Sequence, residues 1–426
     1  MKQPPDRKHL RRWFLPIALM NASVALGGPL TPLGLSPDWT RLNVYQKTMP
    51  AHRFVEQLTH LFAPSDAWSN SAQLHETYVD LLTGGASFHL DFAPIERPDG
   101  NRPPRFWRSV DDLSPAPIDR PLEGVRIVLD PGHLGGPWAK MEERWFQIKN
   151  TKPVTEGDLT LRVAQLLQPR LTALGAIVTL TRNSSEPVTP LRPNGFLEQA
   201  RISLEQRGVH PIVPTYSSTI DPMKEHSIQW EAEKLFYRIA EIHARAHLIN
   251  DRLKPDLVVC LHFNAEPWFD SGNPTLVDTN HLHLIVNGNY SQGELAYDDT
   301  RFEMFERLLN QPSAEEQSIS EQVAESLAAV TRLPPYQYDS PNAIPVGKTG
   351  YLWARNLLAN RLFRCPVIYI ECYVMNDHEF FDRYQAGEYP GWREFNGVAH
   401  KNIFAEYCDG VAIGLEQYFF EHRKHL

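Results

Sequence analysis

The sequence is poor in the features that mark several classes of protein. Its 426 residues include only four cysteines, Cys260, Cys365, Cys372 and Cys408, and none of them forms a C-x-x-C pair. This spacing excludes a zinc knuckle and a thioredoxin-like motif, and four cysteines in so long a chain do not make a disulfide framework. Positive charge is also in deficit, because the formal net charge is -9. That balance argues against a nucleic-acid partner, which favours basic surfaces.

Long apolar runs are absent, with one exception near the N-terminus. Basic residues between positions 8 and 12 precede the mostly apolar run 13–25, which ends in Ser23-Val24-Ala25. The order basic, apolar, small is that of a secretory signal peptide. The run is too short to span a bilayer comfortably as a mature helix. We therefore expect an exported protein of the periplasm or cell envelope, with residues 1–25 as its signal peptide and no stable membrane span in the mature chain.

The rest of the chain divides into two regions. Residues 26–120 contain a helical pattern at 54–62 and two apolar runs around a Gly-Gly turn at 78–92, which predict a helix and a hairpin. A proline-rich stretch, 94–121, follows and is interpreted as a linker. No chemistry is visible in this region, which is either an accessory module or a packing extension of the main domain.

From residue 121 to 426, strands and helices alternate. Apolar runs predict strands and amphipathic stretches predict helices, the strands at 125–129, 176–181, 257–261, 282–286 and 367–370, and the helices at 158–174, 230–253, 319–330 and 402–420. Strands this apolar need cover on both faces, which predicts an α/β fold with a mostly parallel twisted sheet flanked by helices on both faces. Two long insertions, at about 183–244 and 287–317, are predicted to be largely irregular up to the helix at 230, and long enough to form lids or substrate walls.

Polar side chains follow three of the predicted strands, at the edge where α/β sheets gather their sites. The first strand leads into Asp130-Pro131-Gly132-His133, the third into His262-Phe263-Asn264, and the fifth ends in Glu371. A further carboxylate, Glu156, precedes the helix at 158–174. Its neighbours at positions 155 and 158 have the spacing of a capping box, which predicts that Glu156 lies in the first helical turn.

Two imidazoles and one carboxylate form a common ligand set for catalytic zinc, which leaves a fourth position for water or a substrate carbonyl. Zinc lowers the pKa of that water to about 7 and polarises the carbonyl. A separate carboxylate is then needed, first as a base and later as an acid. His133, His262 and Glu156 are the candidate ligands. Glu371 fits the acid–base role, since an unpaired carboxylate at the end of an apolar strand is costly without a function.

Other residues compete for these roles. Two carboxylates after the first glycine turn could replace Glu156 as a ligand, and two histidines that alternate on the strand at 282–286 could face one side together. Two more histidines have i, i+4 spacing on the helix at 230–253, but the Glu of an H-E-x-x-H motif is missing between them, so we interpret them as surface or packing residues. These competitors are Glu142 and Glu143, His281 and His283, and His243 and His247.

The blocks as a whole resemble those of the zinc-dependent N-acetylmuramoyl-L-alanine amidases of the bacterial cell-wall and cell-separation type. That family opens with a DPGHGG turn, continues with an E-x-x-x-x-L-x-x-A helix that ends in L-x-x-x-G-x-x-V-x-L-T-R, and then has R-x-x-x-A-N and a strand ending in S-I-H-x-N-A. The matching stretches here are 130–136 (DPGHLGG), 156–164, 171–182 (LTALGAIVTLTR), 245–250 (RAHLIN) and 257–265 (LVVCLHFNA). The blocks occur in the family's order and span roughly residues 122 to 420.

The resemblance implies one zinc ion per chain, held by His133, Glu156 and His262, with Glu371 as the catalytic carboxylate. It implies hydrolysis of the amide bond between N-acetylmuramic acid and L-alanine in peptidoglycan or a muropeptide, for cell-wall turnover or cell separation.

Arg355 lies near a family arginine, so the resemblance implies that it helps to hold the substrate or Glu371, and Asn264, which belongs to the H-x-N-A block, is expected to bind substrate as well. Leu134 and Cys260-Leu261 depart from the family pattern, and the two long insertions exceed it. They leave two alternatives open: a zinc hydrolase of the same fold that acts on another amide or peptide, and a non-catalytic wall-binding protein. Dependence on an activator protein is open as well.

Overall fold

A computed structural model describes residues 28–94, 102–267 and 274–426. The predicted signal peptide and residues 95–101 of the predicted linker lie outside the described residues. Within the described ranges, no helix is both long enough and apolar enough to cross a membrane.

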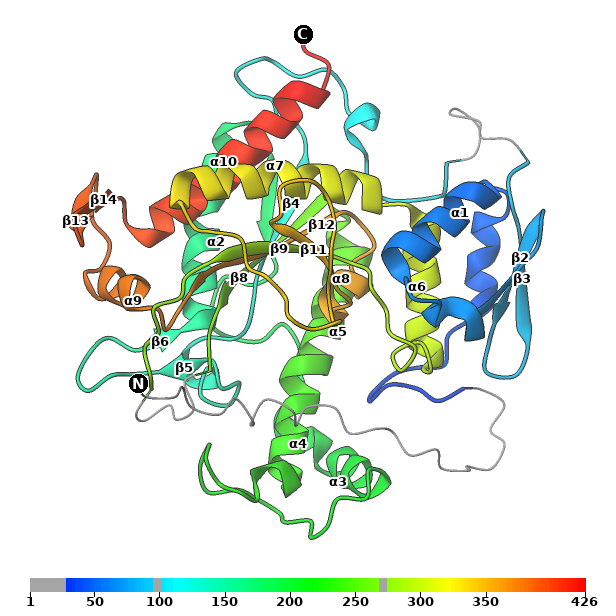
Figure 1. Cartoon of the computed structure of the whole chain (residues 1–426), viewed down its shortest axis with the longest axis horizontal. Helices are drawn as coiled ribbons and strands as arrows, with labels where there is room; N and C mark the ends of the chain where they lie inside the picture. Colours follow the sequence, from blue (N-terminus) through cyan, green and yellow to red (C-terminus); the bar gives the residue numbers. More distant parts are fainter. Residues whose placement is uncertain (1–27, 95–101, 268–273) are drawn as a thin grey trace, which may run out of the picture.

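A seven-stranded mixed sheet forms the centre of the molecule (Figure 1). In order across the sheet, its strands are β10 (Ile344–Pro345), β11 (Leu352–Ala354), β9 (Leu282–Val286), β12 (Val367–Val374), β8 (Leu257–Asn264), β4 (Arg126–Pro131) and β7 (Ile177–Leu180). Strands β7, β4, β8 and β12 are parallel to one another, and β11 is parallel to β9. Strand β9 is antiparallel to β12, and β10 to β11. The predicted mostly parallel sheet and all five predicted strands are confirmed.

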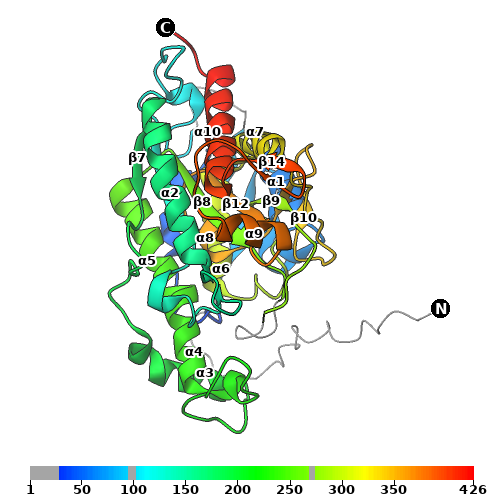
Figure 2. The same ribbon diagram turned by 90° about the vertical axis from the view of Figure 1, so that its left-hand side faces the viewer.

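Helices cover both faces of the sheet, as predicted. One face carries α2 (Glu156–Ala173), α7 (Ser313–Thr331) and α10 (Ile403–His422), whose apolar residues join the main core. The other face carries α5 (Glu241–His247) and α8 (Leu358–Leu362), where a second core contains Val128, Cys260 and Tyr369. Figures 1 and 2 show α7 and α10 lying together across the sheet.

The first long insertion is more helical than predicted. A continuous helical segment combines α4 (Ile228–Lys234) and α5 with two π-helical turns, Leu235–Ala240 and Leu248–Leu253, and confirms the helix predicted at 230–253. Before it, α3 (Leu197–Gln206) packs against α4 in a smaller core that also includes Leu134, and the pair projects from one end of the sheet (Figures 1 and 2).

The second insertion also contains a helix, α6 (Asp298–Asn310). The prediction of irregular structure was therefore wrong for parts of both insertions. Helix α3 buries only Ala200 and Leu204, so its apolar stripe is too short to predict a helix from the sequence. Short helices of this kind owe their stability to the surface on which they pack rather than to their own sequence.

The N-terminal region contains the predicted helix and hairpin. Helix α1 (Ala51–Gln57) continues into a π-helical turn, Leu58–Phe62, and β1 (Ala72–Leu74), β2 (Tyr78–Leu82) and β3 (Ser87–Asp91) form an antiparallel sheet. This region packs on α6, where Phe54 stacks on Phe305 with ring centroids 6.3 Å apart. Its apolar residues share the main core, while the domain boundary at residue 120 stays a prediction.

The remaining elements are short. The strands β5 and β6 pair with each other, as do β13 and β14, and α9 and several 3-10 turns complete the chain. Their bounds are β5 (Trp145–Phe146), β6 (Val154–Thr155), β13 (Arg393–Phe395), β14 (Val398–His400), α9 (His378–Gln385), and 3-10 turns at Trp39–Tyr45, Ala67–Asn70, Val110–Asp112, Gly136–Trp138, Pro193–Phe196 and Lys224–His226.

Candidate active site

The turn after β4 carries His133 in an unusual backbone conformation. Its φ is 55°, in the left-handed region that non-glycine residues rarely adopt. The buried guanidinium of Arg245 holds this turn, because it donates to the carbonyl oxygens of Pro131 (2.7 Å) and His133 (3.3 Å) and pairs with Asp130 (3.0 Å). Such strain persists where the surroundings over-determine it, which is common at functional sites.

Glycines allow the turn to approach its neighbours closely. A Cβ atom at Gly132 would overlap the imidazole ring of His262, and one at Gly157 would overlap the backbone of Leu134. Side chains at either position would push β4 away from β8 or from α2. The two glycines therefore bring the turn, the strand that carries His262 and the start of α2 to one point.

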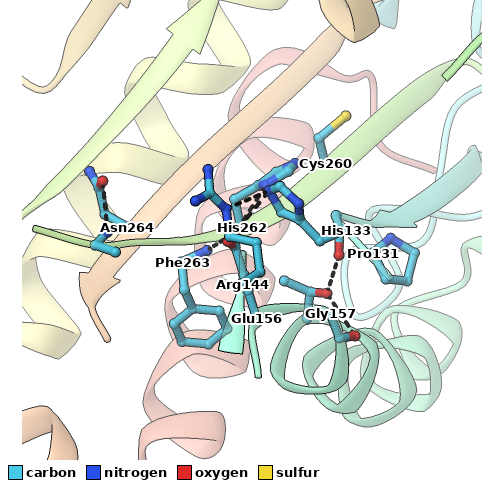
Figure 3. A network of polar contacts seen from close by, with 12 residues as sticks. Pro131, His133, Arg144, Glu156, Gly157, Cys260, His262, Phe263 and Asn264 are labelled. Atoms are coloured by element: carbon cyan, nitrogen blue, oxygen red, sulfur yellow. Dashed lines mark hydrogen bonds and ion pairs between the residues drawn. The ribbon is translucent and has the colours of Figure 1, made fainter. Parts of the chain in front are cut away.

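Glu156 is the first residue of α2 and its carboxylate is buried between the two histidines. Its Oε1 lies 3.2 Å from Nδ1 of His262 and accepts the backbone N–H of Phe263 at 3.3 Å, and its Oε2 lies 3.4 Å from Nε2 of His133. Ligand atoms of the three side chains all lie within 4.8 Å of one another. Figure 3 shows both imidazoles directed at the carboxylate. The prediction that Glu156 lies in the first turn of the helix is confirmed.

The predicted capping box is wrong. Thr155 is the N-cap of α2, but its side chain caps no backbone N–H and instead donates to the carboxylate of Asp158 at 2.7 Å. That carboxylate also accepts the backbone N–H of Gly136 at 2.9 Å. Asp158 is thus used to anchor the glycine turn rather than to close the helix end.

A second carboxylate, that of Glu142, determines which tautomer His133 adopts. Oε2 of Glu142 lies 2.9 Å from Nδ1 of His133, and Glu142 also accepts the backbone N–H of Leu134. Burial lowers the pKa of His133 well below its usual value, so the ring is neutral. The carboxylate then selects the tautomer with hydrogen on Nδ1, which leaves the lone pair of Nε2 facing Glu156.

Glu371 faces the same side of the sheet as His262. The two residues are register partners on the parallel strands β12 and β8, and Glu371 is also paired with His283 on β9. Burial raises the pKa of Glu371 to about 7. The prediction that the strand ends at Glu371 was wrong, because β12 continues to Val374 after an irregularity in its register.

A family model described as N-acetylmuramoyl-L-alanine amidase matches residues 127–390, which include all of these side chains. The chain belongs to this amidase family. A search of the curated proteins found no significant match.

Several solved structures resemble the amidase at low sequence identity. The amidase Ami1 from Mycobacterium smegmatis is 16% identical, with 70% of this chain and 98% of that chain covered and a TM-score of 0.36. The CwlD amidase from Clostridioides difficile, solved in complex with the GerS lipoprotein, is 13% identical over 69% and 98%, with a TM-score of 0.38. The catalytic domain of CwlV from Bacillus (Paenibacillus) polymyxa var. colistinus is 12% identical over 70% and 97%, with a TM-score of 0.34.

Arg144 belongs to the amidase site but was not predicted from the sequence. Nε of Arg144 lies 3.1 Å from Oε2 of Glu156 and donates to Nε2 of His133 at 3.4 Å (Figure 3). Burial opposes the charge of this guanidinium, but the carboxylates of Glu156 and Glu371 raise its pKa, so it remains a cation. Arg144 lies in a loop without a recognisable motif, and no local pattern could have identified it.

The aromatic residues around His262 were also missed. The ring of Tyr369 stacks on the imidazole of His262 with centroids 4.4 Å apart, and the hydroxyl of Tyr407 donates to the carbonyl oxygen of His262 at 3.0 Å. The sequence around both tyrosines is mostly apolar, which predicts core residues rather than residues of a site.

The competing carboxylates have other partners in the amidase. Glu142 binds His133 from outside the group of three, and Glu143 pairs with Lys224 of the first insertion. The geometry therefore does not favour Glu142 or Glu143 over Glu156 as a metal ligand.

The remaining predicted residues lie around this centre or away from it. Asn264 ends β8, and its side-chain oxygen accepts the backbone N–H of Ala265 at 3.0 Å. Arg355 follows β11, and its guanidinium lies 5.8 Å from the ring centroid of Tyr338. Their roles in substrate binding stay predictions. His247 is exposed and pairs with Asp251, in agreement with its interpretation as a surface residue.

Proposed function

We propose that this amidase is zinc-dependent and hydrolyses the amide bond between N-acetylmuramic acid and L-alanine in peptidoglycan, during cell-wall turnover or cell separation. The observation that carries the proposal is the convergence of His133, Glu156 and His262, with Glu371 on the neighbouring strand. The family membership of the chain supports the choice of bond.

The donor set fits zinc. It offers two imidazole nitrogens and one carboxylate oxygen, which is a ligand set of catalytic zinc sites that keep one position open. Among the residues that the structure describes, this is the one group of three or more such side chains close enough to hold an ion. Glu142 supports it further, because ligating histidines usually donate their second N–H to a carboxylate or carbonyl oxygen. We therefore assign one zinc ion per chain.

Glu371 is the proton carrier in the proposed reaction. Zinc, when bound, polarises the lactyl carbonyl and lowers the pKa of the attacking water. The carboxylate of Glu371 takes one proton from this water as the oxygen of the water attacks the carbonyl carbon. Glu371 then passes this proton to the amide nitrogen as the C–N bond breaks. The products are the lactyl carboxylic acid of muramic acid and the free amine of L-alanine. A pKa of about 7 suits a group that must both accept and donate.

Arg144 supplies positive charge on the same side of the site. The lone pair of Nε2 of His133 can serve either the N–H of Arg144 or zinc, so the guanidinium is available as a donor when zinc is held. In the proposed reaction, its N–H groups donate to the negative charge that develops on the carbonyl oxygen. Donors placed in this way are among the largest contributions to acyl-transfer catalysis.

The proposal places the enzyme outside the cytoplasm, in the periplasm or cell envelope, because its substrate is the cell wall. The predicted signal peptide is consistent with this location. We expect residues 1–25 to be missing from the protein recovered from the envelope of expressing cells, and sequencing of its N-terminus would test this.

The deciding experiment measures metal content and products together. We expect the purified wild type to hold one zinc ion per chain, and both His133→Ala and Glu156→Ala to lose it. Incubation with peptidoglycan should release peptides that begin with a free L-alanine amine and leave muramic acid with a free lactyl carboxylate. A protein that holds no zinc after zinc is supplied, yet binds cell walls, would leave wall binding as the function. If another amide were cleaved faster than a muramoyl peptide, the protein would be a hydrolase of that other amide.

A further inference from the structure

A cluster of aromatic rings next to Glu371 has no part in the chemistry described above. We call it the ring cluster and define it as His281, His283, Tyr336, Tyr338 and Trp353. The ring of Tyr336 lies over His281 and His283 with centroids 4.5 and 4.9 Å away, and it contacts Tyr338 at 4.8 Å. Tyr338 in turn contacts Trp353 at 5.0 Å. The cluster therefore forms one continuous set of rings.

The ring cluster adjoins Glu371 on the side away from the proposed zinc ligands. His283 of β9 and Glu371 of β12 are antiparallel register partners, so their side chains are neighbours on one face of the sheet. His281 precedes His283 by two residues and faces the same side. Since His262 is the partner of Glu371 on its other side, the order across this face is His262, Glu371 and the ring cluster.

Several polar atoms of the ring cluster are buried without a hydrogen-bond partner. They are both ring nitrogens of His281, Nδ1 of His283 and Nε1 of Trp353. Nε2 of His283 is paired, at 3.1 Å from the hydroxyl of Tyr338. Nε2 of His281 lies 3.8 Å from a carboxylate oxygen of Glu266, beyond hydrogen-bonding distance. Buried polar groups in folded proteins almost always have partners, so these imidazole nitrogens need partners that the protein does not supply, either water or a polar ligand that replaces it.

The charges around the ring cluster favour an uncharged ligand. Burial lowers the pKa of His281 to about 4 and that of His283 to about 3, so both rings are neutral at pH 7 and each carries one donor and one acceptor. Among the residues that the structure describes, the charged groups that face the rings are three carboxylates and one guanidinium, namely Glu266, Glu371, Asp339 and Arg355. A peptide carboxylate would meet more negative than positive charge there.

We propose that the ring cluster binds an N-acetylated sugar of the glycan strand, beside the amide that Glu371 hydrolyses. Sugar hydroxyl and acetamido groups both donate and accept, as neutral imidazoles do, and the aromatic faces offer apolar surface to the ring of the sugar. This inference rests on the proposed function for the position of the sugar relative to the amide. The ring of Tyr336 covers the imidazoles, so the proposal requires this side chain to rotate away when the sugar binds.

The backbone at Tyr336 and just before it is attached to β9. The backbone N–H of Tyr336 donates to the carbonyl oxygen of Leu282 at 3.0 Å, and the N–H of Leu282 donates to Pro334 at 3.0 Å. These bonds attach the segment to the first residue of β9, so the half-buried ring is the part that the proposal requires to rotate.

Binding of a peptide-free saccharide tests the proposal directly. We would titrate the zinc-loaded full-length protein with the trisaccharide of N-acetylglucosamine by calorimetry. The wild type should bind it, and His281→Phe and His283→Phe should each bind at least about tenfold more weakly, because phenylalanine keeps the ring and removes its donor and acceptor. His281→Asn, which keeps one donor and one acceptor, should restore binding to within about threefold of the wild type.

Controls separate recognition of the sugar from effects on folding. His89→Phe, at an exposed histidine of β3, should bind the trisaccharide like the wild type, and a glucose trisaccharide without acetamido groups should bind more weakly than the acetylated one. The melting temperature of His281→Phe should not fall, since the imidazole that it replaces makes no hydrogen bond within the protein. His283→Phe also removes the contact with the hydroxyl of Tyr338, so its melting temperature should fall by no more than the loss of one hydrogen bond explains. A wild type that does not bind the acetylated trisaccharide, or phenylalanine variants that bind it like the wild type, would overturn the proposal.

Hydrolysis is measured separately, so that the two proposals can fail independently. Cleavage of muramoyl peptides without saccharide binding would remove the sugar site and leave the amidase mechanism. Saccharide binding without cleavage would keep the sugar site and remove the amidase mechanism. With glycan-linked substrate, His283→Phe should raise KM at least about fivefold while kcat changes less than about twofold, because ground-state binding is lost. An equal fall in kcat and kcat/KM would instead make His283 part of the chemical step and contradict a binding role.

Discussion

Nδ1 of His133 lies 2.9 Å from Oε2 of Glu142, on the side of the ring opposite Glu156. Partners of this kind typically change metal affinity 10- to 100-fold. We expect Glu142→Ala to bind zinc about 10- to 100-fold more weakly than the wild type, measured by competition with a chelator. Glu143→Ala is the matched control and should bind like the wild type, since its carboxylate pairs with Lys224. If Glu142→Ala lost zinc completely and Glu156→Ala kept it, Glu142 would be the metal ligand and Glu156 the supporting carboxylate.

Glu371→Gln should separate chemistry from metal binding. The amide keeps the shape of the side chain but cannot accept the proton of the attacking water. We expect one zinc ion per chain to remain and kcat for muramoyl-peptide cleavage to fall about 10²- to 10⁴-fold. Normal turnover by this variant would show that another group carries the proton.

Arg144→Gln should slow the reaction without removing the metal. Loss of one charged donor from an oxyanion site typically lowers kcat about 10²-fold or more. We expect an effect of about this size, with zinc content equal to that of the wild type. Lys140→Gln, which removes a nearby cation that lies over Trp145, should leave kcat within about twofold of the wild type. Equal effects of the two substitutions would reduce the role of Arg144 to general surface charge.

The stability of the fold should depend on the protonation of His281 and His283. Burial lowers the pKa of both imidazoles below the unfolded value of 6.5, to about 4 and about 3. Below pH 6.5 the unfolded chain therefore binds protons that the folded chain does not, so stability falls as the pH decreases. Each ring contributes a slope of about 1.4 kcal/mol per pH unit between about pH 6 and pH 4.

Urea unfolding at several pH values would measure this dependence. The double variant His281→Phe/His283→Phe should lose less stability between pH 6.5 and pH 4.5 than the wild type does, while carboxylates elsewhere titrate equally in both. Parallel curves for the two proteins would mean that the rings are protonated in the folded state as well.

A buried ion pair should be needed for the fold around β12. Arg307 of α6 and Glu316 of α7 are both buried and paired, and the carboxylate also accepts the backbone N–H groups of Asn287 and Val367. Removal of one partner leaves an uncompensated charge, which typically costs about 3–5 kcal/mol. We expect Arg307→Leu to lower the free energy of unfolding by about this amount. Arg162→Ala, which breaks a half-exposed pair with Glu388, should cost less than about 1 kcal/mol.

Much of the fold could be predicted because its central elements are buried on both sides. A strand covered on both faces is an unbroken apolar run, as at 257–261, and α2 has a regular apolar stripe. Helices α3 and α6 were not predicted, because their stability comes from contacts with α4 and with the N-terminal region. The capping box failed for the same kind of reason, since the distant Gly136 binds the carboxylate of Asp158.

The sequence by itself determined the order of the five predicted strands and of the helices that cover them, the family blocks, and the presence of a histidine or carboxylate near the C-terminal ends of three neighbouring strands. Only the tertiary structure decided which carboxylate faces which imidazole. It placed Glu156 between His133 and His262, Glu142 behind His133, and Arg144 beside both. It also placed His283 next to Glu371. These contacts join elements that are far apart in the chain, and their distances depend on how loops and helices pack around the sheet, which no local pattern of residues encodes.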